Sequence, residues 1–348
     1  MVDKNAPSST ARTDAVADRL FRPLHDLRVS VTDRCNFRCV YCMPKSVFDK
    51  DYEFLKRDQI LSWDNIVSVV EAAAPLGVRK IRLTGGEPLI RNDLEALIER
   101  IACVDGIEDI SMTTNAVLLT KRRAESLRDA GLKRINVSLD AMDDDTFRAM
   151  NDMGVGVDSV LQGIDNAMNA GIDNVKVNMV VKKGLNDHSI LPMAKHFHGT
   201  GQILRFIEFM DVGNSNAWNL TDVITSQEIA DRIHAQMPIQ PAEANYRGEV
   251  AKRWSYTDGG GEIGIISSVS DPFCGDCSRA RLSATGSIYT CLFASEGHDL
   301  KPVLKLNDAE ALSNHLKRIW EIREDRYSET RTQVVTLRPK VEMSFIGG

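Results

Sequence analysis

The sequence lacks the features that mark several large classes of protein. No apolar run approaches the roughly 20 residues that a membrane-spanning helix needs. Basic residues are not in excess, because 43 Lys and Arg stand against 49 Asp and Glu, for a net charge of −6. Proteins that bind nucleic acid usually show a basic balance. We therefore expect neither a membrane protein nor a partner of nucleic acid.

The N-terminal residues lack the apolar stretch of a secretory signal. Residues 1–17 are polar and contain Ser, Thr and Asp, and we interpret residues 1–20 as a disordered leader. The chain also lacks an even set of cysteines: it has seven, six of them in two groups of three, which argues against a disulfide framework. Reduced cysteines are typical of the cytoplasm, where we expect this protein to act.

The first group of cysteines follows an apolar strand directly. Cys35, Cys39 and Cys42 have the spacing C-x3-C-x2-C. Three thiolates on one short loop can hold three irons of a [4Fe–4S] cluster, which leaves the fourth iron open to a small molecule. Structural zinc is less favoured, because it needs four ligands and no His or further Cys follows within forty residues. The loop resembles the signature of the radical S-adenosylmethionine (SAM) enzymes, whose open iron binds SAM.

The second group has the spacing C-x2-C-x13-C. It consists of Cys274, Cys277 and Cys291. Taken alone, a structural zinc site with His298 as fourth ligand stays an alternative. Beside the first loop, a second [4Fe–4S] cluster is favoured, and its open iron could bind a substrate.

From residue 26 to about residue 237, apolar strands alternate with helical patterns. The predicted strands are Leu27–Thr32, Lys80–Thr84, Asp109–Thr114, Arg134–Leu139, Val175–Val181 and Ile203–Phe209. The predicted helices are Asp64–Ala74, Leu94–Cys103, Lys121–Ala130, Ser159–Ala170 and Asp187–Phe197, with Ser62 or Asp64 as the N-cap of the first. This alternation predicts a parallel α/β sheet. We expect residues 21–240 to form an open six-unit (βα) partial TIM barrel.

After about residue 240 the alternation ends. Tyr246–Thr257 and Glu262–Ser270 are predicted strands, a hairpin is predicted around residues 284–286, and Asp308–Asp325 is a predicted helix. We expect residues 241–348 to form a β-rich capping segment that carries the second cysteine group and covers the open side of the barrel.

Polar residues lie at the C-terminal ends of the predicted strands, where parallel barrels carry their functional loops. One strand ends in Thr84-Gly85-Gly86-Glu87. Glycines after a strand most often form a tight turn. Without Cβ atoms, however, this backbone could also approach a ligand closely. Six polar strand ends on one rim favour a site.

Five cations point to an anionic substrate. Arg279 and Arg281 share one face of a strand, because alternate residues point to the same side. Arg28 and Arg82 lie within otherwise apolar strands, where a charge needs a partner. Lys176 is the fifth. A single Arg is usually solvated surface charge, but together these residues predict a polyphosphate ligand, since guanidinium groups bind phosphate in a bidentate manner.

Five runs extend the resemblance over nearly the whole chain. They are Asp26–Cys35, Arg82–Leu89, Val137–Ala141, Arg205–Asp211 and Cys277–Leu282, and they resemble the GTP 3′,8-cyclase family, radical SAM enzymes that open molybdenum cofactor biosynthesis. Gly347-Gly348 resembles the double-glycine tail of that family, thought to enter the catalytic pocket, although such an end would otherwise be a frayed terminus. Ala116 departs from the family, which usually carries Gly there.

The resemblance implies site residues, cofactors and partners. It implies SAM contacts by Tyr41, Gly86, Ser138 and Met210. It implies GTP contacts by Arg28, Arg82, Thr113, Lys176, Arg279, Ala280 and Arg281, with Arg28, Arg279 and Arg281 as catalytic residues. The implied cofactors are two [4Fe–4S] clusters and SAM. The implied partners are GTP, an unidentified electron donor, a downstream cyclic pyranopterin monophosphate synthase that consumes the product, and a second copy of the chain in a homodimer.

The implied reaction begins with a 5′-deoxyadenosyl radical, which takes the hydrogen from C3′ of the GTP ribose. Attack of C3′ on C8 of guanine then gives 3′,8-cyclo-7,8-dihydro-GTP. Two alternatives stay open on the residues alone. One is a radical SAM enzyme that modifies a peptide or protein, and the other is a non-catalytic protein in which both cysteine groups are structural metal sites.

Overall fold

The computed structural model describes residues 15–246, 248–331 and 339–347. Its strands are β1 (Asp26–Ser30), β2 (Lys80–Thr84), β3 (Asp109–Thr114), β4 (Arg134–Ser138), β5 (Asn174–Val181), β6 (Ile203–Glu208), β7 (Ile239–Ala242), β8 (Lys252–Tyr256), β9 (Glu262–Ile266), β10 (Arg279–Leu282), β11 (Ser287–Tyr289) and β12 (His298–Asp299). Its helices are α1 (Trp63–Ala73), α2 (Leu94–Ala102), α3 (Lys121–Asp129), α4 (Asp144–Asn151), α5 (Val157–Asn169), α6 (Ile190–Phe197), α7 (Ser226–His234), α8 (Lys301–Leu304), α9 (Ala309–Glu321), α10 (Tyr327–Thr330) and α11 (Met343–Ile346).

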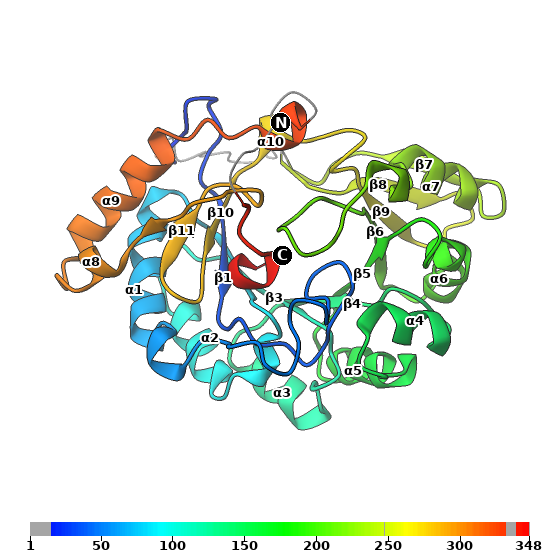
Figure 1. Ribbon diagram of the computed structural model, residues 1–348, viewed down its shortest axis with the longest axis horizontal. Helices are drawn as coiled ribbons and strands as arrows, with labels where there is room; N and C mark the ends of the chain where they lie inside the picture. The colour runs from blue at the N-terminus through cyan, green and yellow to red at the C-terminus, as the bar shows by residue number, and fades with distance from the viewer. Residues whose placement is uncertain (1–14, 247, 332–338, 348) are drawn as a thin grey trace, which may run out of the picture.

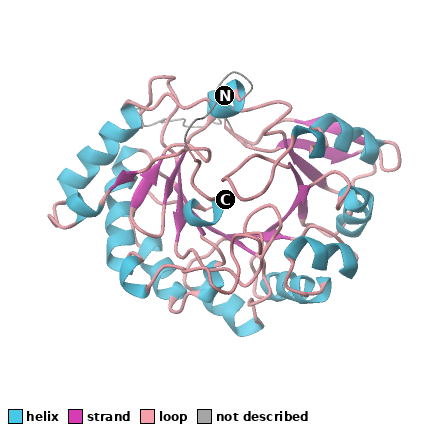
Figure 2. Ribbon diagram, viewed as in Figure 1, coloured by secondary structure: helices cyan, strands magenta, loops and turns pink. Residues whose placement is uncertain are grey.

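All these strands belong to one twelve-stranded sheet. The strand order is β12-β11-β10-β1-β2-β3-β4-β5-β6-β9-β8-β7. Every pairing from β10 to β9 is parallel, and the pairings beyond them at each edge are antiparallel. Figure 2 shows the strands as an open arc with the helices on its outer side. The C-terminal ends of the parallel strands therefore meet at one rim, as in other parallel barrels.

The central barrel confirms the predicted α/β fold. The six predicted strands correspond to β1–β6, with ends that differ by at most two residues. The predicted helix at Asp187–Phe197 begins as a 3-10 turn, and its α-helical part is α6. Two helices, α4 and α7, were not predicted. The sequence signal for α4 is Asp143 at the N-cap position. In the structure its carboxylate accepts a hydrogen bond from the backbone N–H of Thr146 at 2.8 Å.

Helix α1 illustrates how local sequence fixes an element. Its N-cap is Ser62, not Asp64, because the Ser62 hydroxyl accepts a hydrogen bond from the N–H of Asn65 at 3.2 Å. Ile66, Val69 and Val70 recur at helical spacing and are buried. This apolar stripe packs α1 on the outside of the sheet, where α9 lies against it.

The C-terminal segment corrects one expectation. It does not only cover the open side of the barrel, because β10 pairs with β1 and β9 pairs with β6, both in parallel. The segment thus continues the sheet from both of its edges, where strands would otherwise leave unpaired backbone groups. The predicted hairpin is confirmed as β10–β11, and the two predicted strands before it are shorter than expected, as β8 and β9.

The predicted disordered leader is also corrected where the structure describes it. The N–H of Val16 donates to the carbonyl of Leu76 at 2.9 Å, and Ala17 forms a bridge with Pro23. The Asp18 side chain is buried. Residues 15–20 are therefore part of the folded domain, held by contacts that are distant in sequence. Residues 1–14 of the predicted leader lie outside the described residues.

Candidate active site

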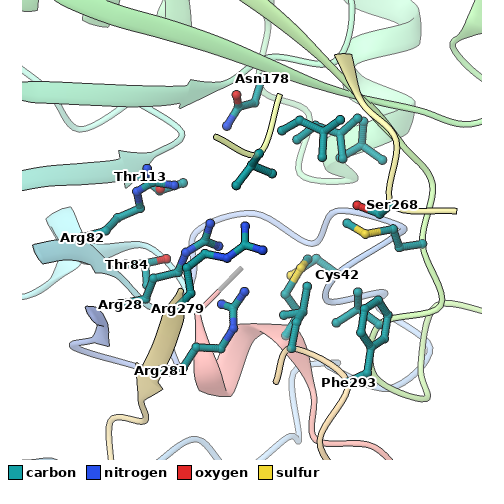
Figure 3. A pocket seen from close by; sticks show the side chains of 18 of the residues that line it. Arg28, Cys42, Arg82, Thr84, Thr113, Asn178, Ser268, Arg279, Arg281 and Phe293 are labelled. Carbon is teal, nitrogen blue, oxygen red and sulfur yellow. The ribbon is translucent and has the colours of Figure 1, made fainter. Parts of the chain in front are cut away.

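A cavity of about 300 Å³ lies inside the arc of the sheet. Both cysteine groups line it, as do Arg28, Arg82, Arg279 and Arg281. Figure 3 shows the arginines gathered on one side of this cavity and Cys42 on the other. The predicted rim of polar strand ends is therefore one enclosed site rather than a row of separate turns.

The first cysteine group lies on the loop after β1. The carbonyl of Cys39 accepts hydrogen bonds from the N–H groups of Cys42 and Met43, both at 2.9 Å, so the loop makes a tight turn around the cavity. Burial, with a contribution from the Glu87 carboxylate, raises the pKa of Cys35 to about 12. Burial also raises the pKa of Cys39 and Cys42. Thiols held this way need a bound cation to become thiolates near neutral pH.

The second cysteine group is assembled from two separate loops. Cys274 and Cys277 precede β10, and Cys291 follows β11. Burial would raise the pKa of Cys277, but the guanidinium groups of Arg279 and Arg323 lower it to about 6. Arg279 Nη2 lies 3.3 Å from Cys277 Sγ, and Arg323 Nη2 lies 3.2 Å from it.

Strand register places three arginines in one row. Arg28 on β1 is directly opposite Arg281 on β10 and Arg82 on β2. Burial, followed by the neighbouring charges of Arg281 and Arg82, lowers the pKa of Arg28. Burial and Arg279 lower the pKa of Arg281 to about 9. Like charges are buried together at a cost that a bound polyanion would offset.

The residues predicted to contact SAM all line the cavity. Tyr41 lies between two cysteines of the first loop, and its hydroxyl donates to Asp140 Oδ2 at 2.9 Å. Ser138 ends β4, and Met210 follows β6. Gly86 follows β2, so four different segments bring these residues to the same cavity.

The residues predicted to contact GTP are not all placed alike. Thr113 lines the cavity with the arginines, whereas Lys176 and Ala280 are not among the lining residues. The Ala280 side chain points to the other face of β10, where it lies with Leu27 and Trp320. Only its backbone could reach a ligand in the cavity. Lys176 lies on the same side of β5 as the lining residue Asn178. Burial, followed by the charges of Arg205 and Arg134, lowers the pKa of Lys176 to about 7.

The structure gives a reason for the two glycines after β2 that the sequence did not show. A Cβ on Gly85 would lie 2.4 Å from the carbonyl oxygen of Thr32, and one on Gly86 would lie 2.2 Å from that of Arg34. Gly85 also has a φ of 149°. The absence of side chains is therefore required by close packing against the loop after β1. This packing holds the glycine turn and the cysteine loop together.

Several lining residues were missed as site residues, although three of them belong to predicted strands. These residues are Arg22, Arg134, Asn178, Arg205 and Arg323. Arg205 Nε and Asn178 Oδ1 are buried and have no hydrogen-bond partner among the described residues. Arg134 and Arg205 lie in otherwise apolar strands, the same signal that identified Arg28 and Arg82. Arg22 and Arg323 gave no signal, because neither lies in a strand.

The C-terminal tail enters the same cavity. Met343 of α11 lines it, and Ile346 is buried. The carbonyl of Gly347 accepts a hydrogen bond from Arg281 Nη1. A Cβ on Gly347 would lie 2.2 Å from Thr84 Cγ2, so the tail needs glycine here. Figure 1 shows this segment in red at the centre of the arc. The prediction of a frayed end, made from sequence alone, is therefore wrong up to Gly347. Gly348 lies outside the described residues.

The thiols of each group fit an iron–sulfur cluster better than a single metal ion. All six are free of disulfides and line one cavity. Among the described residues, no three His, Cys, Asp or Glu side chains form a site for one metal ion. His298, the alternative zinc ligand, is exposed on β12 and does not line the cavity. Three thiolates on the wall of one cavity are a donor set that a [4Fe–4S] cluster can use.

The open parallel barrel and the cysteine loop on its rim define a radical SAM protein. Residues 29–197 match the radical SAM superfamily, and residues 202–329 match the family described as Molybdenum Cofactor Synthesis C. A solved structure of Streptococcus suis SuiB bound to its precursor peptide SuiA has the same fold, with a TM-score of 0.59, 16% identity, and coverage of 91% of this chain and 68% of that one. SuiB bound to S-adenosylmethionine gives a TM-score of 0.55 and 16% identity, over 85% of this chain and 68% of that one.

Two curated relatives identify the family within this superfamily. A GTP 3′,8-cyclase of Xanthomonas campestris pv. campestris (strain B100) is 53% identical over 331 residues, which cover 95% of this chain and 97% of the relative. A GTP 3′,8-cyclase of Staphylococcus aureus (strain JH9) is 47% identical over 340 residues, which cover 96% and 99%. The chain belongs to the GTP 3′,8-cyclase family. Within the described residues, no helix combines the length and apolar character needed to cross a membrane.

Proposed function

We propose that this protein converts GTP into (8S)-3′,8-cyclo-7,8-dihydroguanosine 5′-triphosphate, with SAM and a reductant, as the first step of molybdopterin cofactor biosynthesis. Membership in the family supports the reaction. The observation that carries it in this chain is the row of Arg281, Arg28 and Arg82 inside a cavity that two cysteine groups also line. A triphosphate is the ligand that such a buried row of guanidinium groups would bind.

The first cysteine group would hold the [4Fe–4S] cluster that binds SAM. When bound, the cluster and SAM supply a carbon radical that can take hydrogen from the substrate ribose. Tyr41, Gly86, Ser138 and Met210 would contact SAM from four segments of the rim. These four residues are half-buried in the cavity wall, where bound SAM and GTP would exclude water and so protect a reactive intermediate from side reactions.

The other side of the cavity would hold GTP. Arg28, Arg279 and Arg281 would bind the triphosphate and fix the position of the ribose, supported by Arg82 and Thr113. Lys176 would add a positive charge from β5, and Ala280 would contribute backbone groups only. The second cysteine group would hold a second [4Fe–4S] cluster, whose open iron would bind the guanine. Fixed orientation of this kind accounts for large factors in rate.

Three further expectations belong to this proposal. An electron donor would reduce the first cluster, a cyclic pyranopterin monophosphate synthase would consume the product, and the chain would act in the cytoplasm as a homodimer. The role of the C-terminal tail is to position Arg281, since the Gly347 carbonyl accepts its hydrogen bond.

Anaerobic turnover tests the proposed function. The purified protein is reconstituted with iron and sulfide, reduced, and incubated with SAM and GTP. We expect 5′-deoxyadenosine and a cyclised nucleotide in equal amounts, and about eight irons per chain if both clusters are present. SAM cleavage without a cyclised nucleotide would favour an enzyme that acts on a peptide, and a zinc-containing protein with little iron would remove the proposal.

A further inference from the structure

A buried cluster of charges lies directly behind the second cysteine group. The Asp18 carboxylate binds Arg22 Nε at 2.6 Å and Arg323 Nη1 at 3.2 Å. The side chains of Asp18 and Arg22 are 0% exposed, and that of Arg323 is 1% exposed. Asp18 and Arg22 come from the N-terminal segment and Arg323 follows α9, so two distant parts of the chain meet beside the second cysteine group.

Both arginines also contact the cysteine loop, and Arg323 Nη1 is shared between Asp18 and that loop. Arg22 Nη1 donates to the carbonyl of Cys274 at 2.8 Å, and Arg323 Nη1 donates to the carbonyl of Cys277 at 2.7 Å. Arg323 Nη2 reaches the Cys277 sulfur itself at 3.2 Å. The backbone contacts hold the loop, and the sulfur contact acts on a cluster ligand.

Arg22 has one group left over. Its Nη2 is buried and has no hydrogen-bond partner among the described residues, although Arg22 lines the cavity. A buried N–H donor without a partner costs about 1–3 kcal/mol. A cluster held by the neighbouring cysteines would bring sulfide acceptors to this side of the cavity.

A purely structural role does not explain this arrangement. Buried ion pairs contribute little net stability, because the desolvation of the charges offsets their attraction. Apolar side chains of similar size would fill the space at lower cost. Hydrogen bonds to the sulfur ligands of a cluster do have a specific effect, since they help to set its reduction potential.

We propose that Arg323 and Arg22, held by Asp18, are positioning residues that set the reduction potential of the second cluster, Arg323 through Cys277 Sγ and Arg22 through a cluster sulfide. This inference rests on the second cluster of the proposed function. Reduction adds negative charge to the cluster, and a cationic donor stabilises that charge. Loss of the donor therefore moves the potential to a more negative value.

Redox titration of the reconstituted full-length chain, followed by electron paramagnetic resonance, tests the proposal. A parallel titration in a variant with Cys35, Cys39 and Cys42 changed to Ala isolates the signal of the second cluster. We expect Arg323→Gln and Arg22→Gln to shift that signal to a more negative potential and to leave the first cluster unchanged. Arg323→Lys keeps the charge beside Asp18 but loses the planar fork, and we expect a smaller shift in the same direction.

The matched control is Arg19→Gln in the same N-terminal segment. Arg19 pairs with Glu324 at 2.9 Å on the surface, and both side chains are more than half exposed. We expect this variant to keep both potentials. If Arg323→Gln fails to fold, Arg323→Lys and Arg22→Gln decide the question.

The outcomes separate this inference from the proposed function. An intact second cluster with wild-type potential in these variants overturns the inference and leaves the function standing. About four irons per chain in the wild type, as a single cluster would give, overturns the second cluster and the inference with it. A shift confined to the second cluster supports both.

Discussion

The two cysteine groups supply the same ligands, but among the described residues guanidinium groups contact a sulfur only in the second. The first lies on one continuous loop, where burial raises the pKa of Cys35, with a contribution from Glu87, and the pKa of Cys39, with a contribution from Asp140. The second is built from two loops, and Arg279 and Arg323 approach the sulfur of Cys277. An anionic triphosphate would be favoured on the side where these guanidinium groups lie.

This contrast would keep GTP on the arginine side of the cavity and SAM on the side of the first cysteine group. The arginine row belongs to the same side as the second cysteine group, since Arg279 contacts Cys277 and Arg281 lies opposite Arg28. Electrostatic complementarity of this kind fixes orientation more than it adds affinity. Substitutions at either cysteine group would remove the contrast, substitutions of the arginines would test its strength, and a substitution in the loop after β3 gives a reference effect.

The largest effect should come from removing one ligand of each group. We expect Cys42→Ala to abolish SAM cleavage and product formation together. We expect Cys277→Ala to keep SAM cleavage while cyclised product falls at least about 100-fold, because misplaced substrate loses near-attack geometry. Quantification of 5′-deoxyadenosine and nucleotide product by chromatography measures both. Normal product from Cys277→Ala would show that the second group has no role in catalysis.

The next effect should come from the arginine row and from its neighbour Arg279. A hydrogen bond to a charged group contributes about 1.5–3 kcal/mol, so we expect Arg279→Ala or Arg281→Ala to weaken GTP binding roughly 10- to 100-fold. SAM cleavage capacity should stay largely intact. Calorimetric titration with GTP measures the affinity.

Arg100→Ala is the control for the row, since Arg100 forms a surface pair with Asp64 at 2.8 Å. It should bind GTP like the wild type. Equal loss of GTP binding and SAM cleavage in the Arg281 variant would mean that this residue supports the whole cavity rather than the substrate.

A smaller effect concerns the pH dependence of GTP binding through Lys176. Burial, then Arg205 and Arg134, lowers the pKa of Lys176 from 10.5 to about 7. A bound triphosphate favours the protonated amine, so binding takes up a proton and the affinity falls as the pH rises through 7. Titrations at several pH values should show this slope, and Lys176→Met should flatten it.

Lys176 also has a consequence for stability. Because its folded-state pKa is lower than the unfolded value, the amine favours the unfolded state at neutral pH, and this penalty disappears as the pH rises from about 7 to 10.5. We expect Lys176→Met to raise the free energy of unfolding at pH 7, as measured in denaturant. A lower value would show that the charge is stabilised by a partner in the folded protein.

The smallest effect should follow Ala116→Gly, in the loop after β3. Ala116 is buried with a φ of 61°, a left-handed conformation that costs an alanine about 1–2 kcal/mol. Glycine removes that strain but loses a buried methyl group and adds entropy to the unfolded chain, by about 1 kcal/mol each at most. We expect a change in unfolding free energy within about 1 kcal/mol and unaltered GTP binding. A loss of more than about 2 kcal/mol would contradict this balance.

Much of the central barrel could be predicted from local patterns. Period-two apolar strands and helical stripes such as Ile66, Val69 and Val70 specify their elements without distant contacts. The glycine pair was harder, because only the position of Thr32 and Arg34 shows why a Cβ is excluded. The placement of Ala280 away from the cavity likewise depended on which face of β10 points into the cavity.

By itself the sequence determined the parallel barrel, the first cysteine loop and the presence of buried arginines, because each of these depends on neighbours in the chain. Only the tertiary structure decided that β10 and β9 extend the sheet at both edges and that Arg281, Arg28 and Arg82 share one row. It also decided that Asp18 binds Arg323, which contacts the sulfur of Cys277. These features come from pairings between residues up to 305 positions apart, and no local spacing encodes the register of such pairings.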